Sequence, residues 1–381
     1  MSESFVSSLS LAKYPLWDRF GDKRTPLAFD LEVTARCNNN CRHCYINVPA
    51  SDRAARGREL TLDEIKRIAD EAVSLGALWC LITGGEPLIR EDFSEIYLML
   101  KKKGLLVSVF TNAGLITDEV VKLFKTYPPR NLEVTVYGVT PKTYERVTRT
   151  PGSFRIFQKG LSLLLRNGIP VRLKSMALRS NKDDLPKIAA FCRKRTIDYF
   201  RFDPFLHLRL DGDSIRNGDI KNERLSAEEI VDLERADRER FQVLEKSCDS
   251  LIFSQEPTEA CGQLFRCGIA NSSFTISSDG FFCLCPSLRH PDCLYDLRKG
   301  TLKEAWEEFS VQVLRRHSKK KSFIETCRVC SIVNLCLWCP AHAHLETGEL
   351  DEPIDYFCKI AHARAEALLE SKRSQGNNKA L

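Results

Sequence analysis

The sequence predicts an α/β protein: a partial (β/α)6 barrel followed by a small cysteine-rich domain. From Leu27 onward, six short runs of β-branched or aromatic residues alternate with helical patterns, which is typical of βα units around a parallel sheet. The 381 residues leave room for two domains. Of the 16 cysteines, ten lie between Cys261 and Cys358, where long apolar runs are few. Burial alone stabilises such a region poorly, so we expect metal ligation to supply the missing stability.

The predicted elements follow one another in a regular order. Thr61 and Glu64 form a capping box that starts the helix after the first strand, and Ile65 and Ile68 begin its core-facing stripe. Later in the chain, Asp279 and Gly280 predict the turn of a hairpin. The predicted strands are 28–34, 78–83, 105–111, 132–137, 171–177 and 199–203; a loop at 211–222, one charged helix at 226–246 and the hairpin at 274–285 follow.

These elements divide the chain into five parts. We expect an N-terminal extension at 1–26, the barrel at 27–225, a bridging helix and linker at 226–260, the cysteine-rich domain at 261–370 and a polar, frayed tail at 371–381.

Composition excludes several classes of protein. The formal charge of +6 on 43.4 kDa is too dilute to indicate nucleic-acid binding. The sequence contains neither a basic secretory signal nor an apolar stretch long enough to span a bilayer, so we expect a cytoplasmic protein without a membrane partner. A reducing compartment disfavours disulfides, which leaves metal binding as the reason for so many cysteines.

The first group of cysteines, Cys37, Cys41 and Cys44, stands directly after the first strand in the segment CNNNCRHCY. Three thiolates complete neither a zinc site nor a four-thiolate cluster, so one metal position stays open. On spacing alone a structural zinc knuckle is an alternative. The spacing, with aromatic Tyr45 after the last cysteine, resembles the radical S-adenosylmethionine (radical SAM) superfamily. That resemblance implies a TIM-type barrel, a [4Fe-4S] cluster and SAM bound at its open iron.

A second motif follows the second strand and agrees with the first. Gly84, Gly85, Glu86 and Pro87 match the GGEP motif of this superfamily. Paired glycines let backbone approach a ligand, and an acidic side chain accepts hydrogen bonds from an ammonium group. The resemblance therefore implies that this segment holds the amino group of SAM.

Further matches lie at strand ends and extend the expected SAM site. Asn112 follows the third strand and Asn181 follows the fifth, and Thr135 is the candidate ribose contact. On the fifth strand Arg172 and Lys174 share one face, so either can hold the SAM carboxylate if that face points into the barrel; an outward, solvated face is equally consistent with the pattern.

The second group of cysteines resembles the SPASM domain that follows many radical SAM cores. The family's order is kept, with one spacing near Cys339 shorter by a residue. The resemblance implies two fully ligated auxiliary [4Fe-4S] clusters, and three clusters in all. Cys283 is an alternative ligand, and two four-cysteine zinc sites are the structural alternative. The implied ligands are Cys261, Cys267, Cys285 and Cys339 for one cluster, and Cys327, Cys330, Cys336 and Cys358 for the other.

The resemblance further implies the reaction. A flavodoxin- or ferredoxin-like donor reduces the first cluster, SAM is cleaved to a 5′-deoxyadenosyl radical, and the substrate is oxidised with the auxiliary clusters taking back an electron. Tyr137, Asp203 and His207, at or beyond strand ends, are the candidate catalytic acid/base groups. Tyr137 stands where many relatives have Asp.

SPASM enzymes are best known for modifying peptides, so a ribosomally made peptide or a protein is the expected substrate. The 27 residues before the first strand are few for a leader-binding domain, so we expect a leader to be bound by a separate leader-peptide-binding protein or by a different surface. Oxidation or decarboxylation of a small molecule, including a tetrapyrrole side chain, is the alternative. A non-catalytic iron-sulfur electron carrier is the alternative from another class, and the GGEP motif argues against it.

Overall fold

All six predicted strands are present in the computed structural model, which describes residues 24–196, 201–252 and 262–377. They are neighbours in one sheet and run parallel in chain order. Their ends differ from the prediction by one or two residues, and residues 197–200 of the last predicted strand lie outside the described part. The strands are β1 (Ala28–Thr34), β4 (Trp79–Gly84), β5 (Leu106–Thr111), β6 (Leu132–Thr135), β7 (Arg172–Met176) and β8 (Arg201–Asp203).

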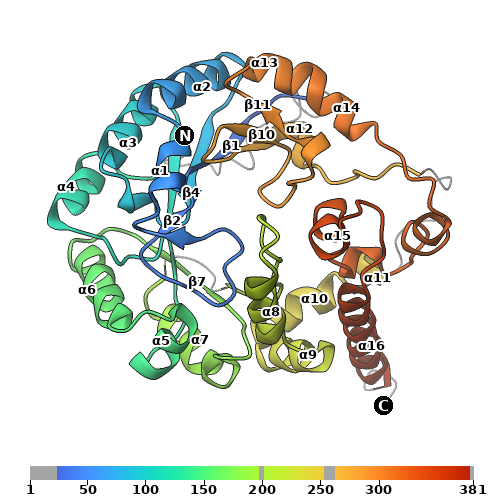
Figure 1. Ribbon diagram of the computed structural model, residues 1–381. Helices are drawn as coiled ribbons and strands as arrows, with labels where there is room; N and C mark the ends of the chain where they lie inside the picture. The colour runs from blue at the N-terminus through green and yellow to red at the C-terminus, as the bar shows by residue number, and fades with distance from the viewer. Residues whose placement is uncertain (1–23, 197–200, 253–261, 378–381) are drawn as a thin grey trace, which may run out of the picture.

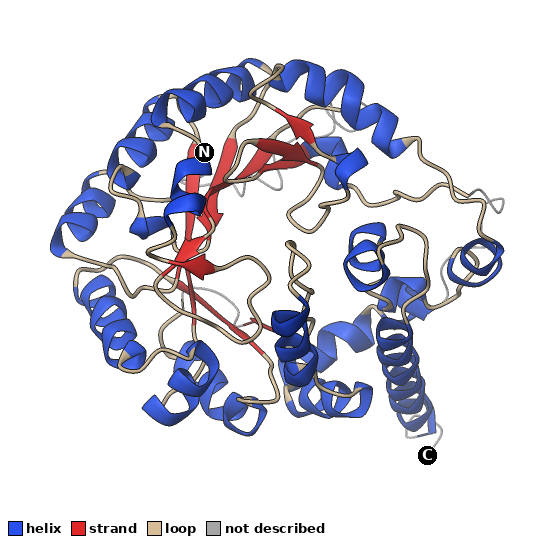
Figure 2. Cartoon of the chain, viewed as in Figure 1, coloured by secondary structure: helices blue, strands red, loops and turns tan. Residues whose placement is uncertain are grey.

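Helices cover the convex side of this curved sheet, as Figure 1 and Figure 2 show. The predicted capping box at Thr61 and Glu64 is formed at the start of α2, whose buried residues include Ile65 and Ile68. The helices of the barrel are α1 (Arg53–Arg58), α2 (Leu62–Ser74), α3 (Phe93–Lys102), α4 (Asp118–Thr126), α5 (Pro141–Thr148), α6 (Ser153–Arg166) and α7 (Leu185–Arg193).

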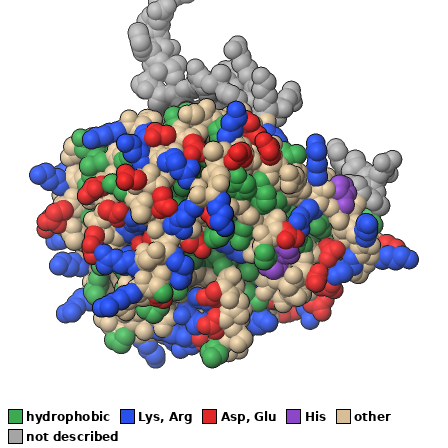
Figure 3. Space-filling view, turned by 45° about the horizontal axis from the view of Figure 1, so that its top comes forward, with side chains coloured by type: hydrophobic (Ala, Val, Ile, Leu, Met, Phe, Trp, Pro, Cys, Tyr) green, Lys and Arg blue, Asp and Glu red, His purple; other side chains and the backbone are tan. Residues whose placement is uncertain are grey.

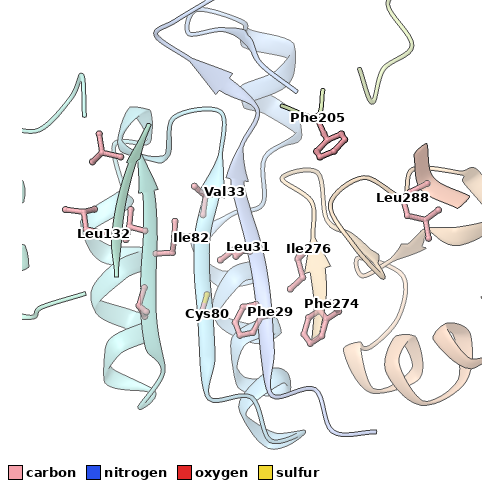
Figure 4. Packing of buried hydrophobic residues seen from close by; sticks show 14 of the residues in the cluster. Phe29, Leu31, Val33, Cys80, Ile82, Leu132, Phe205, Phe274, Ile276 and Leu288 are labelled. Carbon is pink, nitrogen blue, oxygen red and sulfur yellow. The ribbon is translucent and has the colours of Figure 1, made fainter. Parts of the chain in front are cut away.

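The predicted hairpin joins the barrel sheet instead of forming a sheet of its own. Its first strand, β9 (Ser273–Ile276), pairs in parallel with β1, and β10 (Phe281–Cys283) and β11 (Tyr295–Asp296) follow. The rings of Phe29 and Phe274 stack with centroids 5.5 Å apart across this junction (Figure 4). The cysteine-rich region and the barrel therefore share one hydrophobic core.

The remaining elements complete the ring around the barrel mouth. Short pieces near the cysteine loop are β2 (Arg36–Cys37), β3 (Val48–Pro49), η3 (Pro87–Ile89) and η4 (Lys182–Asp184). After β8 come α8 (Ser214–Glu223), α9 (Ala227–Ala236), α10 (Arg238–Lys246), α11 (Cys248–Ile252), α12 (Ile269–Ser272), η5 (Pro291–Cys293), α13 (Leu302–Glu304), η6 (Ala305–Phe309), α14 (Ser310–Leu314), η7 (Phe323–Cys327), η8 (Val333–Leu335), α15 (Pro340–Thr347) and α16 (Asp355–Asn377).

Three predicted segments differ from the structure. The polar stretch predicted as a loop forms α8, because the Asp213 side chain caps it by accepting from the amides of Ile215 and Arg216. The predicted charged helix is broken at Asp237, which ends α9 and caps α10. The predicted frayed tail is helical as far as Asn377, where the described residues end.

The described helices include none that is both long and apolar enough to cross a membrane. On the face shown in Figure 3, basic and acidic side chains are interspersed and form no single-sign stripe.

Candidate functional site

A cavity of about 290 Å³ opens at the carboxyl ends of the barrel strands, and most of the predicted site residues line it. This is the edge at which parallel barrels place their ligands. The cavity brings together side chains that come from five strands and from the cysteine loop. The predicted residues in its wall are Cys37, Cys41, Cys44, Tyr45, Gly84, Gly85, Asn112, Thr135, Tyr137, Lys174, Asp203 and His207.

The three cysteines of the loop face hydrogen-bond donors that suit thiolates. The amide of Asn39 and the side chain of Asn112 donate to the Cys37 sulfur, at 3.4 and 3.7 Å. Burial raises the pKa of Cys37 to about 12, so the thiol keeps its proton unless a metal displaces it. A hydrogen bond from Tyr137 opposes the burial that raises the pKa of Cys41. The loop therefore fits a metal group that needs three thiolates.

The two glycines of the second motif serve a different contact from the predicted one. A methyl group on Gly84 would lie 2.1 Å from the carbonyl oxygen of Thr34, and one on Gly85 would lie 2.3 Å from that of Arg36. Gly84 also has a left-handed backbone, with φ of +132°. The backbone that they approach is thus the end of β1, directly before Cys37, although both glycines also border the cavity.

Glu86 is fully buried and does not line the cavity. Its oxygens accept from the hydroxyl of Thr111 at 2.8 Å, and from the amides of Asn112 at 2.7 Å and Leu88 at 3.2 Å. The carboxyl therefore ties the end of β4 to the end of β5, and its predicted contact with an ammonium group stays a prediction. Pro87 is buried at the start of η3 and also lies outside the cavity wall.

The basic face of β7 points into the barrel, which settles the orientation that the sequence left open. Lys174 and Met176 line the cavity. The Lys174 ammonium lies 3.0 Å from a Glu133 oxygen and 3.3 Å from the centre of the Phe110 ring. A cation held in this way, partly exposed to the cavity, can meet a carboxylate with little reorganisation.

Asn181 does not reach the cavity, contrary to the prediction. Its side-chain amide donates to the carbonyls of Tyr137 and Met176, at 3.1 and 3.0 Å, and its oxygen accepts from the amide of Leu178. All its polar atoms are thus used to join the ends of β6 and β7, which positions Tyr137.

The three candidate acid/base groups differ in their surroundings. Burial lowers the pKa of His207 to about 3, so its imidazole is neutral. Burial raises the pKa of Asp203, while the amide of Phe205 donates to it at 2.9 Å. Burial raises the pKa of Tyr137 further above its ordinary value, which keeps the phenol protonated. The site therefore offers a neutral base and a neutral acid side by side in one wall.

Sequence reasoning missed three residues around these groups. His43, between two cysteines of the loop, lines the cavity with its ring 5.1 Å from that of Tyr137. His342 packs edge to face on His207 at 4.4 Å, and Ser287 lies 3.3 Å from the His207 ring nitrogen. One signal in the sequence pointed to His342 and Ser287: His342 follows the predicted ligand Cys339 by three residues, and Ser287 follows the predicted ligand Cys285 by two.

The second group of cysteines separates into two sets, as predicted from the family pattern. Cys339 is close enough to Cys285 and Cys267 for their charges to interact. Cys261 lies outside the described residues. Cys327, Cys330, Cys336 and Cys358 form the other interacting set.

Cys283 contacts side chains of the barrel junction and is also close enough to Cys285 for their charges to interact. The guanidinium of Arg289 lies 2.5 Å from its sulfur, and Arg289 also pairs with Glu32 at 2.7 Å. The alternative ligand role of Cys283 therefore stays a prediction.

No set of three His, Cys, Asp or Glu side chains within the described ranges is close enough to hold a single metal ion. The cysteine sets are thus wider than the tetrahedral shell of one zinc ion. A cluster in which each thiolate binds its own iron needs no such close approach.

Comparison with known proteins gives two family matches. Residues 31–192 match the radical SAM superfamily, and residues 267–331 match the iron-sulfur cluster-binding SPASM domain.

Three relatives illustrate what the chain is similar to. An AdoMet-dependent heme synthase of Methanosarcina barkeri is 24% identical over 85% of this chain and 94% of the relative. The subtilosin biosynthesis protein AlbA of Bacillus subtilis is 32% identical over 43% of this chain and 36% of the relative. The crystal structure of Streptococcus suis SuiB bound to precursor peptide SuiA has a TM-score of 0.66 at 16% identity, and the match covers 90% of this chain and 78% of SuiB.

Proposed function

The chain belongs to the radical SAM superfamily and carries a C-terminal SPASM domain, and from this premise we propose that it oxidises a peptide or protein substrate in the cavity at the barrel mouth. Members of this family are SAM-dependent enzymes that bind [4Fe-4S] clusters, and this protein is one of them. The observation that carries the proposal is the convergence of the cysteine loop, the GG turn, Lys174 and the three acid/base candidates on one cavity.

We assign Cys37, Cys41 and Cys44 to the SAM-binding cluster. Bound there, a [4Fe-4S] cluster with SAM would supply the radical chemistry that removes a hydrogen atom from a substrate. The protein's task is to hold the thiolates and to exclude water. The amide donors around Cys37 and the burial of Cys41 serve both needs.

The SAM molecule would be held mainly by side chains at the ends of β5, β6 and β7. Lys174 faces the cavity as the partner of the SAM carboxylate, and its pairing with Glu133 keeps it from swinging away. Asn112 and Thr135 offer polar atoms for the ribose, and Tyr45 adds an aromatic face.

His207 lines the cavity as a neutral imidazole, although the burial that lowers its pKa to about 3 makes it a weak base. Oxidising a substrate by loss of a hydrogen atom and an electron also releases a proton, for which His207 is the candidate acceptor by position. Asp203 and Tyr137 complete the polar wall: burial raises the pKa of both, and the phenol of Tyr137 stays protonated and can donate a hydrogen bond.

The two cysteine sets of the SPASM domain are proposed to hold the clusters that receive the substrate electron. Cys267, Cys285 and Cys339, with Cys261, would hold the first. His342 lies between this set and the cavity, with its amide 3.5 Å from the Cys339 sulfur and its ring against His207. The set containing Cys327 would hold the second, and a flavodoxin- or ferredoxin-like protein would reduce the SAM-binding cluster.

Peptide modification is supported by two of the comparisons. SuiB binds a precursor peptide on the same architecture, and AlbA is a bacteriocin biosynthesis protein.

A tetrapyrrole substrate is the second candidate. It is favoured by the heme synthase relative, whose similarity extends over 85% of this chain and 94% of its own. On this alternative, Lys174 or another cation near the cavity would face a propionate side chain.

The proposed chemistry is tested by anaerobic reconstitution followed by iron counting and a SAM cleavage assay with dithionite. The wild type is expected to hold about twelve irons per chain and to release 5′-deoxyadenosine. The Cys37→Ala/Cys41→Ala/Cys44→Ala variant is expected to lose about a third of the iron and all the cleavage. Iron without SAM cleavage by the wild type would contradict the proposal and leave an electron carrier.

The substrate is tested by incubating the active enzyme with peptides encoded beside its gene, and separately with propionate-bearing tetrapyrroles. Loss of hydrogen from a peptide in the mass spectrum supports the first candidate. Loss of carbon dioxide from a tetrapyrrole, with the peptides unchanged, would contradict the peptide substrate and support the tetrapyrrole substrate.

A further inference from the structure

The cysteine loop is held by hydrogen bonds from the segment that leads into α8. Residues 209–216 donate hydrogen bonds to backbone carbonyls of the loop. The amide of Leu210 donates to the carbonyl of Tyr45 at 3.0 Å. Arg209 donates to the carbonyls of Cys44 and Asn47, at 3.4 and 3.2 Å. Arg216 donates to the carbonyl of Cys41 at 3.3 Å.

Asn47 connects the two arginines. Its side-chain oxygen accepts from Arg216 at 2.8 Å and from Arg209 at 3.3 Å, and its side-chain amide donates to the carbonyl of Asn39 at 3.1 Å. Asn47 is 3% exposed and Arg209 is 4% exposed, so these bonds are sheltered from water. Two of the three loop cysteines therefore have a carbonyl fixed by an arginine.

The two arginines differ in how their charge is balanced. Arg209 forms a two-point ion pair with Asp211, whose carboxylate also accepts from the amide of Asp213. Arg216 forms no ion pair with a carboxylate in the part of the chain that the structure describes; its guanidinium bonds are to Cys41 and Asn47. Arg42, on the loop itself, has Glu223 at 3.7 Å. Asp213 accepts from the backbone amide of Arg216, while the Arg216 guanidinium is directed at the cysteine loop.

We propose that Arg216 is a positioning residue that raises the reduction potential of the SAM-binding cluster, and that Arg209 and Asn47 hold it in place. The inference rests on the proposed assignment of Cys37, Cys41 and Cys44 as ligands. Reduction adds one electron to the cluster, so a nearby cation that is partly shielded from water stabilises the reduced form more than the oxidised form. The guanidinium acts through the loop backbone and needs no contact with SAM or substrate.

Three variants separate charge from packing. Arg216→Gln removes the charge and keeps a donor, Arg216→Lys keeps the charge, and Arg193→Gln removes an arginine that pairs with Asp237 on the outside of the barrel. Each is reconstituted as the full chain without SAM and titrated with a low-potential reductant while the reduced cluster is followed by electron paramagnetic resonance. The Cys37→Ala/Cys41→Ala/Cys44→Ala variant identifies the auxiliary signals, which serve as the internal standard.

We expect Arg216→Gln to keep its iron and to weaken the reduced state of the first cluster about tenfold, which moves its midpoint about 59 mV more negative. Arg216→Lys and Arg193→Gln should stay near the wild type, and the auxiliary midpoints should not move. An unchanged midpoint in Arg216→Gln would overturn the proposal, as would an equal shift in Arg216→Lys. Loss of the first cluster from Arg216→Gln would also overturn it and leave a purely structural role. Failure of the proposed function itself would appear differently, as a wild type with no first-cluster signal.

Discussion

At Gly85 there is no room for a methyl group, and this single fact connects the GG turn to the cysteine loop. A Cβ atom there would lie 2.3 and 2.6 Å from the carbonyl oxygens of Arg36 and Ala35. Those oxygens belong to the backbone that leads directly into Cys37. The turn and the loop therefore position each other, whatever either contributes to SAM binding.

We expect Gly85→Ala to displace the loop and to cost about 1–3 kcal/mol through overpacking. The variant should lose about a third of the iron while the auxiliary signals persist. Iron counting with electron paramagnetic resonance measures this. Gly57→Ala is the matched control, because a methyl group there meets nothing within 4 Å. Full iron content in Gly85→Ala would show that the loop tolerates the shift.

Asp30 is a buried carboxyl on the inner face of β1, and burial raises its pKa to about 6 from the ordinary 3.8. Because the folded state holds the proton more tightly, the stability due to this group is complete below about pH 3.8. It is lost as the pH rises through about 6.

Asp30→Asn cannot ionise, so we expect it to unfold at the same denaturant concentration as the wild type in acid. Above about pH 6 it should be more stable by about 1–3 kcal/mol. Urea unfolding of the metal-free chain over a pH series measures the difference. The exposed Asp232→Asn serves as the control, and a constant difference at every pH would contradict the expectation.

Among the secondary-structure elements, the periodic sequence pattern predicted the repeated strands of the barrel. Whether a polar segment such as α8 forms a helix depended on local capping. The six strands were predictable because each is a short apolar run bounded by turn residues. The helix α8 was not, since its sequence is polar and its start depends on one capping carboxyl at Asp213. The cysteine sets and the cavity wall followed from motifs. Glu86 and Asn181 lie outside the cavity wall. The motifs could not show this, because a motif gives residue type and order and does not show whether a side chain turns toward the cavity or toward the next strand.

Arg289 joins the loop after the hairpin to the barrel. Its guanidinium pairs with Glu32 of β1, which is 2% exposed, and contacts the sulfur of Cys283. Burial raises the pKa of Glu32 to about 7 although Arg289 lowers it. Removing the arginine would therefore leave an unpaired carboxylate inside the junction.

We expect Arg289→Met to lose about 3–5 kcal/mol of unfolding free energy at a pH above about 7, where Glu32 is ionised. The loss should shrink in mild acid, because the carboxyl can then take up a proton. The double variant Glu32→Gln/Arg289→Met should recover most of the stability. Urea unfolding of the three proteins at two pH values measures this, and a double variant no better than the single one would argue against a charge effect.

For the whole molecule, the shared sheet determines how the metal sites relate. Because β9 pairs with β1, the auxiliary region cannot move away from the barrel without breaking strand pairing and the contact between Phe29 and Phe274. His342 and His207 touch across this fixed boundary. This fixed arrangement suits electron transfer from the cavity to the cysteine sets, because such transfer needs constant distances between the sites and needs no movement of one domain against the other.

Removing one auxiliary cluster should separate radical formation from substrate oxidation, because the two steps use different metal sites. Cys327→Ala/Cys330→Ala removes two of the four cysteines in the set Cys327, Cys330, Cys336 and Cys358, which we call the outer cysteine set. This set lies far along the chain from the loop at Cys37. We expect iron to fall from about twelve to about eight per chain. SAM cleavage should continue, since the first cluster and its cavity are untouched, but formation of oxidised product should fall sharply, because an electron passed to the remaining auxiliary cluster has no onward acceptor. Cys192→Ala, a buried cysteine of α7 outside both sets, should keep its iron and its product. Product formed at the wild-type rate by the double variant would mean that the outer cluster has a structural role and that electrons leave by another route.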